Sequence, residues 1–121
     1  MIGPVGSQDV QVDTFSFSIP EGYELNEDLS INESDGKDRL VSRFWQNSDD
    51  FIQIDVSYST GGNVDQNKVA RDLGGNKTSM MGYDGYYEEI SDAYSFTFVK
   101  DNKLITVYTS TADLLDEIEL L

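Results

Sequence analysis

Apolar and polar residues alternate over several stretches of the chain, and this period of two is typical of β-strands that bury one face. In the first stretch the apolar side consists of Val12, Phe15, Phe17 and Ile19. Pro20-Glu21-Gly22 ends it, because proline and glycine interrupt a strand ladder. The pattern therefore predicts that ordered structure starts near residue 10 with a strand that is buried on one face.

Two later stretches predict a β-hairpin. Residues 40–45 and 51–58 are rich in β-branched and aromatic side chains, and Asn47-Ser48-Asp49-Asp50 between them supplies turn-forming residues. The second stretch puts Ile52, Ile54 and Val56 on one face and Gln53 and Asp55 on the other. The acidic residues 26–38 before the hairpin predict a turn-rich segment.

Residues 77–110 predict a meander of four strands with breaks at Asp84-Gly85, Ser91-Asp92 and Asp101-Asn102. Asp-Gly is the strongest of these turn signals, because both central positions of a type I′ turn need a positive φ. In the third strand Tyr94, Phe96 and Phe98 alternate with smaller residues.

Two helices complete the predicted elements. The first covers about 64–73, with Asn63 as its N-cap, Gln66 in the capping-box position and Gly74-Gly75 at its exit. The second covers 112–121 and is capped by Ser110 or Thr111. Its apolar residues recur at helical spacing and are Leu114, Leu115, Ile118 and Leu121.

These elements predict one α+β domain over residues 10–121, preceded by a disordered lead-in over 1–9. The expected architecture is an antiparallel β-sheet flanked by helices, an α/β/α sandwich. The predicted core residues are Phe15, Phe17, Ile19, Ile54, Val56, Phe96, Phe98, Leu114 and Ile118.

The net charge of the chain limits which classes of partner it can bind. The 121 residues include 23 acidic and 8 basic ones, for a net charge of −15. Such a charge repels phosphate backbones and anionic lipids, so neither nucleic-acid binding nor binding to a membrane surface is expected. No apolar stretch approaches the ~20 residues that span a bilayer, so membrane insertion is not expected either. Two interpretations stay open: a solvated acidic shell, or patches near residues 21–38 and 113–119 that attract a basic protein partner.

The chain contains no cysteine and no histidine. This excludes disulfides, zinc sites built on those residues and the commonest general base, so no metal, cofactor or catalytic residue is expected. The segment from Asn32 to Asp38 resembles a calcium loop, but placing Gly36 at the sixth position puts Ile31 and Ser42 where end ligands are needed. A plain turn is the favoured interpretation.

Two side-chain groups remain as candidates for function. The carboxylates Asp55, Glu88 and Glu89 lie on predicted strands, where a rigid sheet could hold an acid pair for hydrolysis. The aromatic residues Tyr83, Tyr86 and Tyr87 surround Asp84-Gly85 and, with Trp45, suit either a partner-binding surface or the packing of a sheet.

The opening Phe15-Ser16-Phe17-Ser18-Ile19-Pro20-Glu21-Gly22-Tyr23, followed by a hairpin, one helix, a meander entered through Gly82 and Gly85 and a terminal helix, resembles the PsbP-like fold family. That resemblance implies an antiparallel sheet with helices on both faces and an accessory or binding role outside the cytoplasm, without a conserved reaction. We therefore expect a non-enzymatic binding or accessory module. A small carboxylate-dependent hydrolase or ligand-binding enzyme is the alternative.

Overall fold

The computed structural model describes residues 6–61 and 64–121, and it is 59% strand and 12% helix. In chain order the elements are β1 (Ser7–Val12), β2 (Phe15–Pro20), β3 (Glu24–Leu25), the 3-10 helix η1 (Glu27–Leu29), β4 (Ile31–Asp35), β5 (Asp38–Gln46), β6 (Phe51–Ser59), α1 (Gln66–Asp72), β7 (Asn76–Met80), β8 (Tyr83–Ile90), β9 (Ala93–Lys100), β10 (Lys103–Thr109), α2 (Ala112–Leu115) and β11 (Glu119–Leu120).

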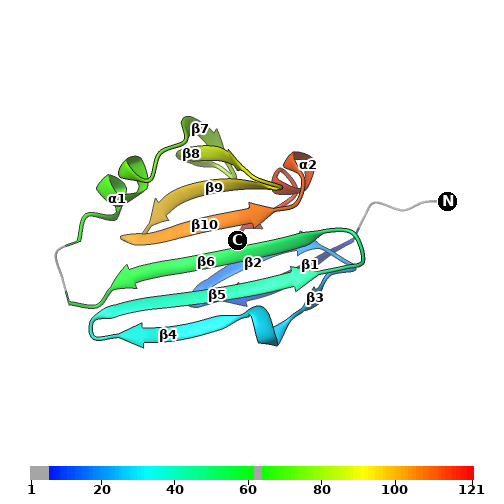
Figure 1. The fold of residues 1–121 in the computed structure, drawn as a ribbon, viewed down its shortest axis with the longest axis horizontal. Coiled ribbons are helices and arrows are strands. Elements are labelled where there is room, and N and C mark those ends of the chain that lie inside the picture. The colour runs from blue at the N-terminus through cyan, green and yellow to red at the C-terminus, as the bar shows by residue number, and fades with distance from the viewer. Residues whose placement is uncertain (1–5, 62–63) are drawn as a thin grey trace.

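Most strands belong to one large antiparallel sheet (Figure 1). Its order is β3-β5-β6-β10-β9-β8-β7, and β4 also pairs with β5. The predicted hairpin is confirmed as β5 and β6, and Asn47 Oδ1 fixes its turn by accepting hydrogen bonds from the backbone N–H groups of Asp49 and Asp50 at 2.9 and 2.7 Å. The predicted meander of four strands is confirmed as β7 to β10.

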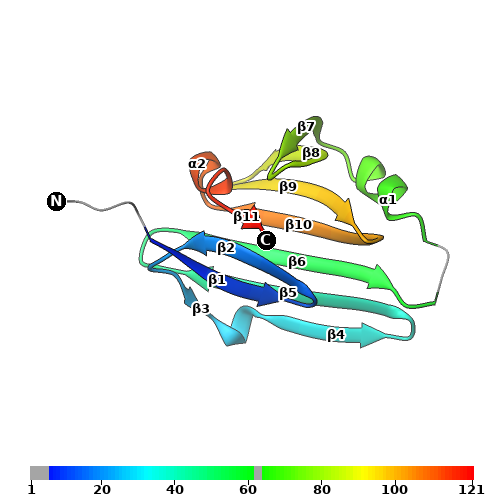
Figure 2. The same ribbon diagram turned by 180° about the vertical axis from the view of Figure 1, so that it is seen from behind.

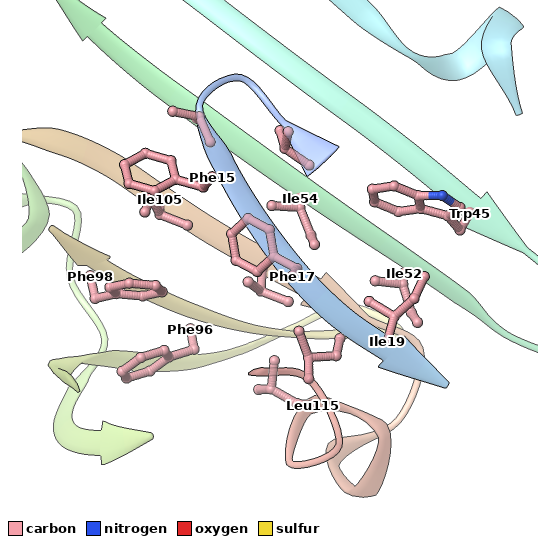
Figure 3. Packing of buried hydrophobic residues seen from close by; sticks show 14 of the residues in the cluster. Phe15, Phe17, Ile19, Trp45, Ile52, Ile54, Phe96, Phe98, Ile105 and Leu115 are labelled. Carbon is pink, nitrogen blue, oxygen red and sulfur yellow. The ribbon is translucent and has the colours of Figure 1, made fainter. Parts of the chain in front are cut away.

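A second, smaller sheet of order β1-β2-β11 packs on one face of the large sheet. Figure 2 shows β1 and β2 in front of β5 and β6, and Figure 1 shows the same strands behind them. The core lies between the two sheets, where Phe15, Phe17 and Ile19 of β2 meet apolar side chains of β6, β9 and β10 (Figure 3). All nine predicted core residues are buried. We call the face of the large sheet on which the small sheet packs the covered face, and the opposite face the open face.

Helix α1 lies on the open face at its β8–β10 end. Ala70 is buried, and Asn67 and Ala70 border the same hollow as Tyr86 and Val99. The helix is capped by Asp65, whose Oδ1 accepts from the backbone N–H groups of Asn67 and Lys68 at 3.1 and 3.4 Å. The predicted cap Asn63 lies outside the described residues.

The predicted sandwich of a sheet flanked by helices is wrong, since a second β-sheet covers the face where a helical layer was expected. Helices α1 and α2 have seven and four residues. At 1.5 Å per residue they are about 10 and 6 Å long, whereas the strands of nine residues in the large sheet extend about 30 Å. Among the described elements outside the large sheet, only the hairpin of β1 and β2 is long enough to cover much of the apolar face.

The predicted second helix is also shorter than expected. It begins after the N-cap Thr111, as predicted, but ends at Leu115, and the following residues form β11. A longer helix would have placed Asp116, Glu117 and Glu119 at its C-terminal end, where the helix dipole disfavours negative charge. Instead, Leu121 donates its backbone N–H to the backbone oxygen of Ser16 at 2.8 Å.

Three further boundaries differ from the prediction. Asp84-Gly85 is no turn but lies inside β8, and the chain turns at Met81-Gly82, where φ is +57° and +82°. Strand β1 begins at Ser7, inside the expected lead-in, and turns into β2 through Asp13 with φ at +55°. The turn-rich segment 26–38 contains β4, an exposed edge strand beside β5.

Candidate functional site

The charged side chains of the central strands are sorted between the two faces of the large sheet. The basic residues of β5, β9 and β10 have the same parity as the core residues of these strands and therefore lie on the covered face: Arg39, Arg43, Lys100 and Lys103. Asp38 and Asp55 have the opposite parity and lie on the open face, and Glu88 of β8 joins them there. Over β5, β6, β9 and β10 the charged side chains of the open face are therefore all acidic, whereas Lys77 of β7 lies on this face beside Tyr86.

Short hydroxyl side chains form the floor of the open face. Four of these hydroxyl side chains are buried: Ser42, Ser95, Thr97 and Thr106. Thr97 and Thr106 share a hydrogen bond of 3.1 Å between their hydroxyl oxygens. The floor is thus polar and shallow, with its hydrogen bonds directed sideways along the sheet.

Asp55 is the partly buried carboxylate at the centre of this floor. Ser42 Oγ donates to Asp55 Oδ1 at 2.5 Å, and Gln53 Nε2 donates to the same oxygen at 3.0 Å. Both donors are uncharged, and among the described residues Oδ2 has no donor. Asp55 is therefore held in one orientation, and its second oxygen remains able to accept a hydrogen bond.

Tyr108 stands beside this carboxylate. Burial raises the pKa of the Tyr108 hydroxyl above its usual value, and the negative charges of Asp55 and Glu88 raise it further. The same negative potential favours an incoming cation. Between Tyr108 and the end of α1 the face has a hollow of about 110 Å³, which is lined by Leu73, Gly74, Tyr86, Glu88, Ile90, Ser95, Thr97, Thr106 and Tyr108.

An aromatic pair lies on the other side of Asp55. The rings of Phe44 and Phe51 stack with centroids 5.4 Å apart and planes inclined by 7°. Both side chains are half-buried, so one side of the stack is accessible. The open face therefore combines carboxylates, hydroxyl groups and exposed aromatic surface, which suits a ligand with both apolar and cationic parts.

The structure does not bring the predicted aromatic cluster together. Trp45 is 4% exposed and belongs to the core. Tyr83 and Tyr87 lie on the covered face, where they stack on Phe98 and Tyr94 with centroids 4.9 and 6.5 Å apart. Of the four, Tyr86 alone lines the open face. The cause is the extended conformation at Asp84-Gly85, which sends successive tyrosines to opposite faces.

The predicted carboxylates are separated in the same way. Asp55 and Glu88 share the open face, whereas Glu89 pairs with Tyr94 and lies on the covered face. Residues 32–38 form the β4–β5 hairpin. Within residues 6–61 and 64–121, no group of three or more aspartates and glutamates is placed to hold a metal ion.

Sequence reasoning missed Tyr108 and the hydroxyl floor. A signal for the floor was present, because Ser95 and Thr97 alternate with Phe96 and Phe98 and mark the polar side of a strand. The sequence does not show which strands are neighbours in the sheet. Only the pairing of β10 between β6 and β9 puts Thr106 and Tyr108 beside Asp55 and Ser95.

Among the described helices, none is long and apolar enough to span a membrane. Comparison with known proteins gave no match to a family model, to a curated protein or to a solved structure.

Proposed function

We propose that this protein is a binding module without a reaction of its own and that its open face binds a basic segment of a protein partner. The observation that carries the proposal is the separation of charge over the central strands β5, β6, β9 and β10 of the large sheet. On the edge strand β7, Lys77 pairs with Tyr86 and lies on the open face. Asp55 and Glu88 lie on the open face, and the basic side chains of β5, β9 and β10 all lie on the other. A basic segment meets no repelling charge over these strands.

The geometry of the open face supports the same proposal. Asp55 Oδ2 can accept a hydrogen bond from a lysine or arginine side chain, and charge-assisted bonds of this kind are stronger than neutral ones. Tyr86, Tyr108 and the Phe44–Phe51 stack offer aromatic surface for the apolar part of such a side chain or for a cation–π contact. The short hydroxyl side chains of the floor leave room for the lysine or arginine side chain of the partner.

An NMR titration with an arginine-rich peptide tests the proposal. The protein, labelled with ¹⁵N, is titrated at low salt with a blocked peptide of about six arginines. We expect the amide signals of Ser95, Thr97 and Thr106 to shift. We also expect the affinity to fall as salt rises, because the attraction is electrostatic.

A matched pair of variants separates a site from a generally acidic surface. The double variant Asp55→Asn and Glu88→Gln removes two charges from the open face, and Glu27→Gln with Asp28→Asn removes two exposed charges from η1. We expect the first pair to weaken binding about tenfold and the second less than about twofold. Equal effects of the two pairs would show that the acidity is only a solvated shell.

A further inference from the structure

A second surface lies on the covered face, where the small sheet ends before the large one does. Figure 2 shows β11 over β10, with β8 and β7 farther out. In the part of the chain that the structure describes, β11 is the last strand of the small sheet on this side. A groove of about 350 Å³ runs along it, and its lining includes Met80, Met81, Asp116, Ile118, Glu119 and Leu120.

The edge of β11 presents backbone hydrogen-bonding groups to this groove. Leu121 donates its N–H to Ser16, and in an antiparallel pair the backbone groups of successive residues point to opposite sides. The N–H and C=O of Leu120 therefore point away from β2 and toward the groove. An unpaired strand edge of this kind is able to pair with another extended chain.

The other side of the groove is apolar and adaptable. Met80 and Met81, at the β7–β8 turn, are half-buried and pack against the core, and Ile118, directly before β11, is buried in the same core. Methionine side chains are flexible and polarisable, so they fit apolar side chains of different shapes. On the rim, Asp116 and Glu119 are exposed and negatively charged.

We propose that an extended segment of a partner protein adds a strand to the small sheet beside β11. Its inward side chains are apolar and enter the groove toward Met80 and Met81. Its outward side chains are basic and lie near Asp116 and Glu119, so the segment alternates apolar and basic residues. This surface is separate from the open face and does not depend on the function proposed for that face.

The test uses an alternating peptide as its probe. A blocked peptide of about eight residues that alternates valine and lysine is titrated into the ¹⁵N-labelled protein, together with a peptide of the same composition that has all valines before all lysines. We expect the amide signals of Leu120, Met81 and Gly82 to shift with the alternating peptide. The block peptide should bind at least about fivefold more weakly, because it cannot place its apolar side chains on one face.

Leu120→Pro removes the N–H that faces the groove without removing a hydrogen bond to β2, and Leu120→Ala keeps that N–H. We expect Leu120→Pro to weaken the alternating peptide at least about tenfold and Leu120→Ala less than about threefold. A second pair keeps the test valid if Leu120→Pro does not fold. Asp116→Asn with Glu119→Gln should weaken binding, and Asp113→Asn with Glu117→Gln, outside the groove, should have little effect.

Two outcomes would overturn the proposal. One is that the affinity for the alternating peptide is unchanged by Leu120→Pro, or that the peptide shifts only the amide signals of Thr97 and Thr106 on the open face. The other is a concentration-dependent dimer in sedimentation that Leu120→Pro dissociates, since a second copy of this chain would then occupy the groove.

Discussion

At the scale of single residues, Asp13 connects the small sheet to the large one. Its Oδ2 accepts a hydrogen bond from Lys103 Nζ at 3.0 Å and its Oδ1 accepts one from the Tyr58 hydroxyl at 3.1 Å. Burial by itself would raise the pKa of Asp13, but the hydrogen bonds from Lys103, the Thr14 backbone and Tyr58 and the charge of Lys103 together hold it below its usual value. The ammonium group also lies 4.3 Å from the centroid of the Tyr58 ring.

We expect Asp13→Asn to destabilise the fold by about 2 kcal/mol at neutral pH, because hydrogen bonds to charged groups contribute about that much. Asparagine tolerates the positive φ at this turn, so the substitution tests mainly the charge. A lowered pKa stabilises the fold above the ordinary value of 3.8, and this contribution is lost as the pH falls through the lowered pKa.

Urea unfolding of both proteins at pH 7 and at about pH 2 measures the effect. The difference in unfolding free energy should be large at pH 7 and shrink at the acidic pH. A difference that stays constant between the two pH values would show that the charge of Asp13 does not stabilise the fold.

At Gly85 the neighbouring strand leaves no space for a side chain. A side chain there would meet the Thr97 carbonyl oxygen of β9 and approach Phe96 Cζ to 2.7 Å. The residue is thus required because of its neighbours and not because of a turn.

We expect Gly85→Ala to destabilise the fold by about 2–3 kcal/mol through this crowding, measured as the shift of the urea midpoint. Gly36 has φ at +61° but open space around it, so Gly36→Ala is the control and should cost about 1 kcal/mol. Equal costs of the two substitutions would contradict the crowding at Gly85.

At the scale of elements, the C-terminal segment changes from helix to strand within a few residues. Helix α2 buries Leu114 and Leu115, and Ile118 follows in the same core at 1% exposure. Leu121, which the helical spacing placed on the buried stripe, is 62% exposed. The pairing with β2 takes the chain away from the helical path after Leu115.

Amide hydrogen exchange distinguishes this arrangement from a continuous helix. The N–H of Leu121 should be protected by its bond to Ser16, and the N–H of Leu120 should exchange faster. In a helix over 112–121 both would be protected alike. Ile118→Ala should cost about 2–4 kcal/mol and the control Leu121→Ala less than about 0.5 kcal/mol.

At the scale of the whole molecule, the net charge of −15 acts on the compact state. The described residues contain only two side-chain ion pairs, Lys103–Asp13 and the exposed Arg71–Asp72 at 3.9 Å. The remaining carboxylates repel one another over a small surface. Salt should therefore stabilise the fold, because it reduces the repulsion between carboxylates more than it reduces the attraction within the two ion pairs.

We expect an increase in NaCl from about 20 to about 300 mM to raise the melting temperature by about 4 °C, which corresponds to about 1 kcal/mol for a domain of this size. Differential scanning calorimetry measures the shift, and KCl at equal ionic strength should give the same result. A melting temperature that falls with salt would show that attractive pairs dominate the charge distribution.

The sequence by itself determined the main strands of the hairpin and the meander and the nine predicted core residues, all of which are buried. The alternation around Phe17, Ile54 and Phe96 is a local pattern, and the burial of apolar side chains follows from it in any packing of these strands. The absence of histidine and cysteine and the excess of acids are also properties of the sequence alone. They limit the chemistry of every surface on the molecule.

Only the tertiary structure decided how the layers are stacked and which polar residues meet. Local patterns do not say whether β2 extends the large sheet or covers it, because both arrangements bury Phe15, Phe17 and Ile19 equally well. The open face depends on β10 lying between β6 and β9, a contact between residues about 50 positions apart. The strand β11 exists because β2 offers it a free edge, and this long-range pairing outweighs the helical spacing of Leu114, Ile118 and Leu121.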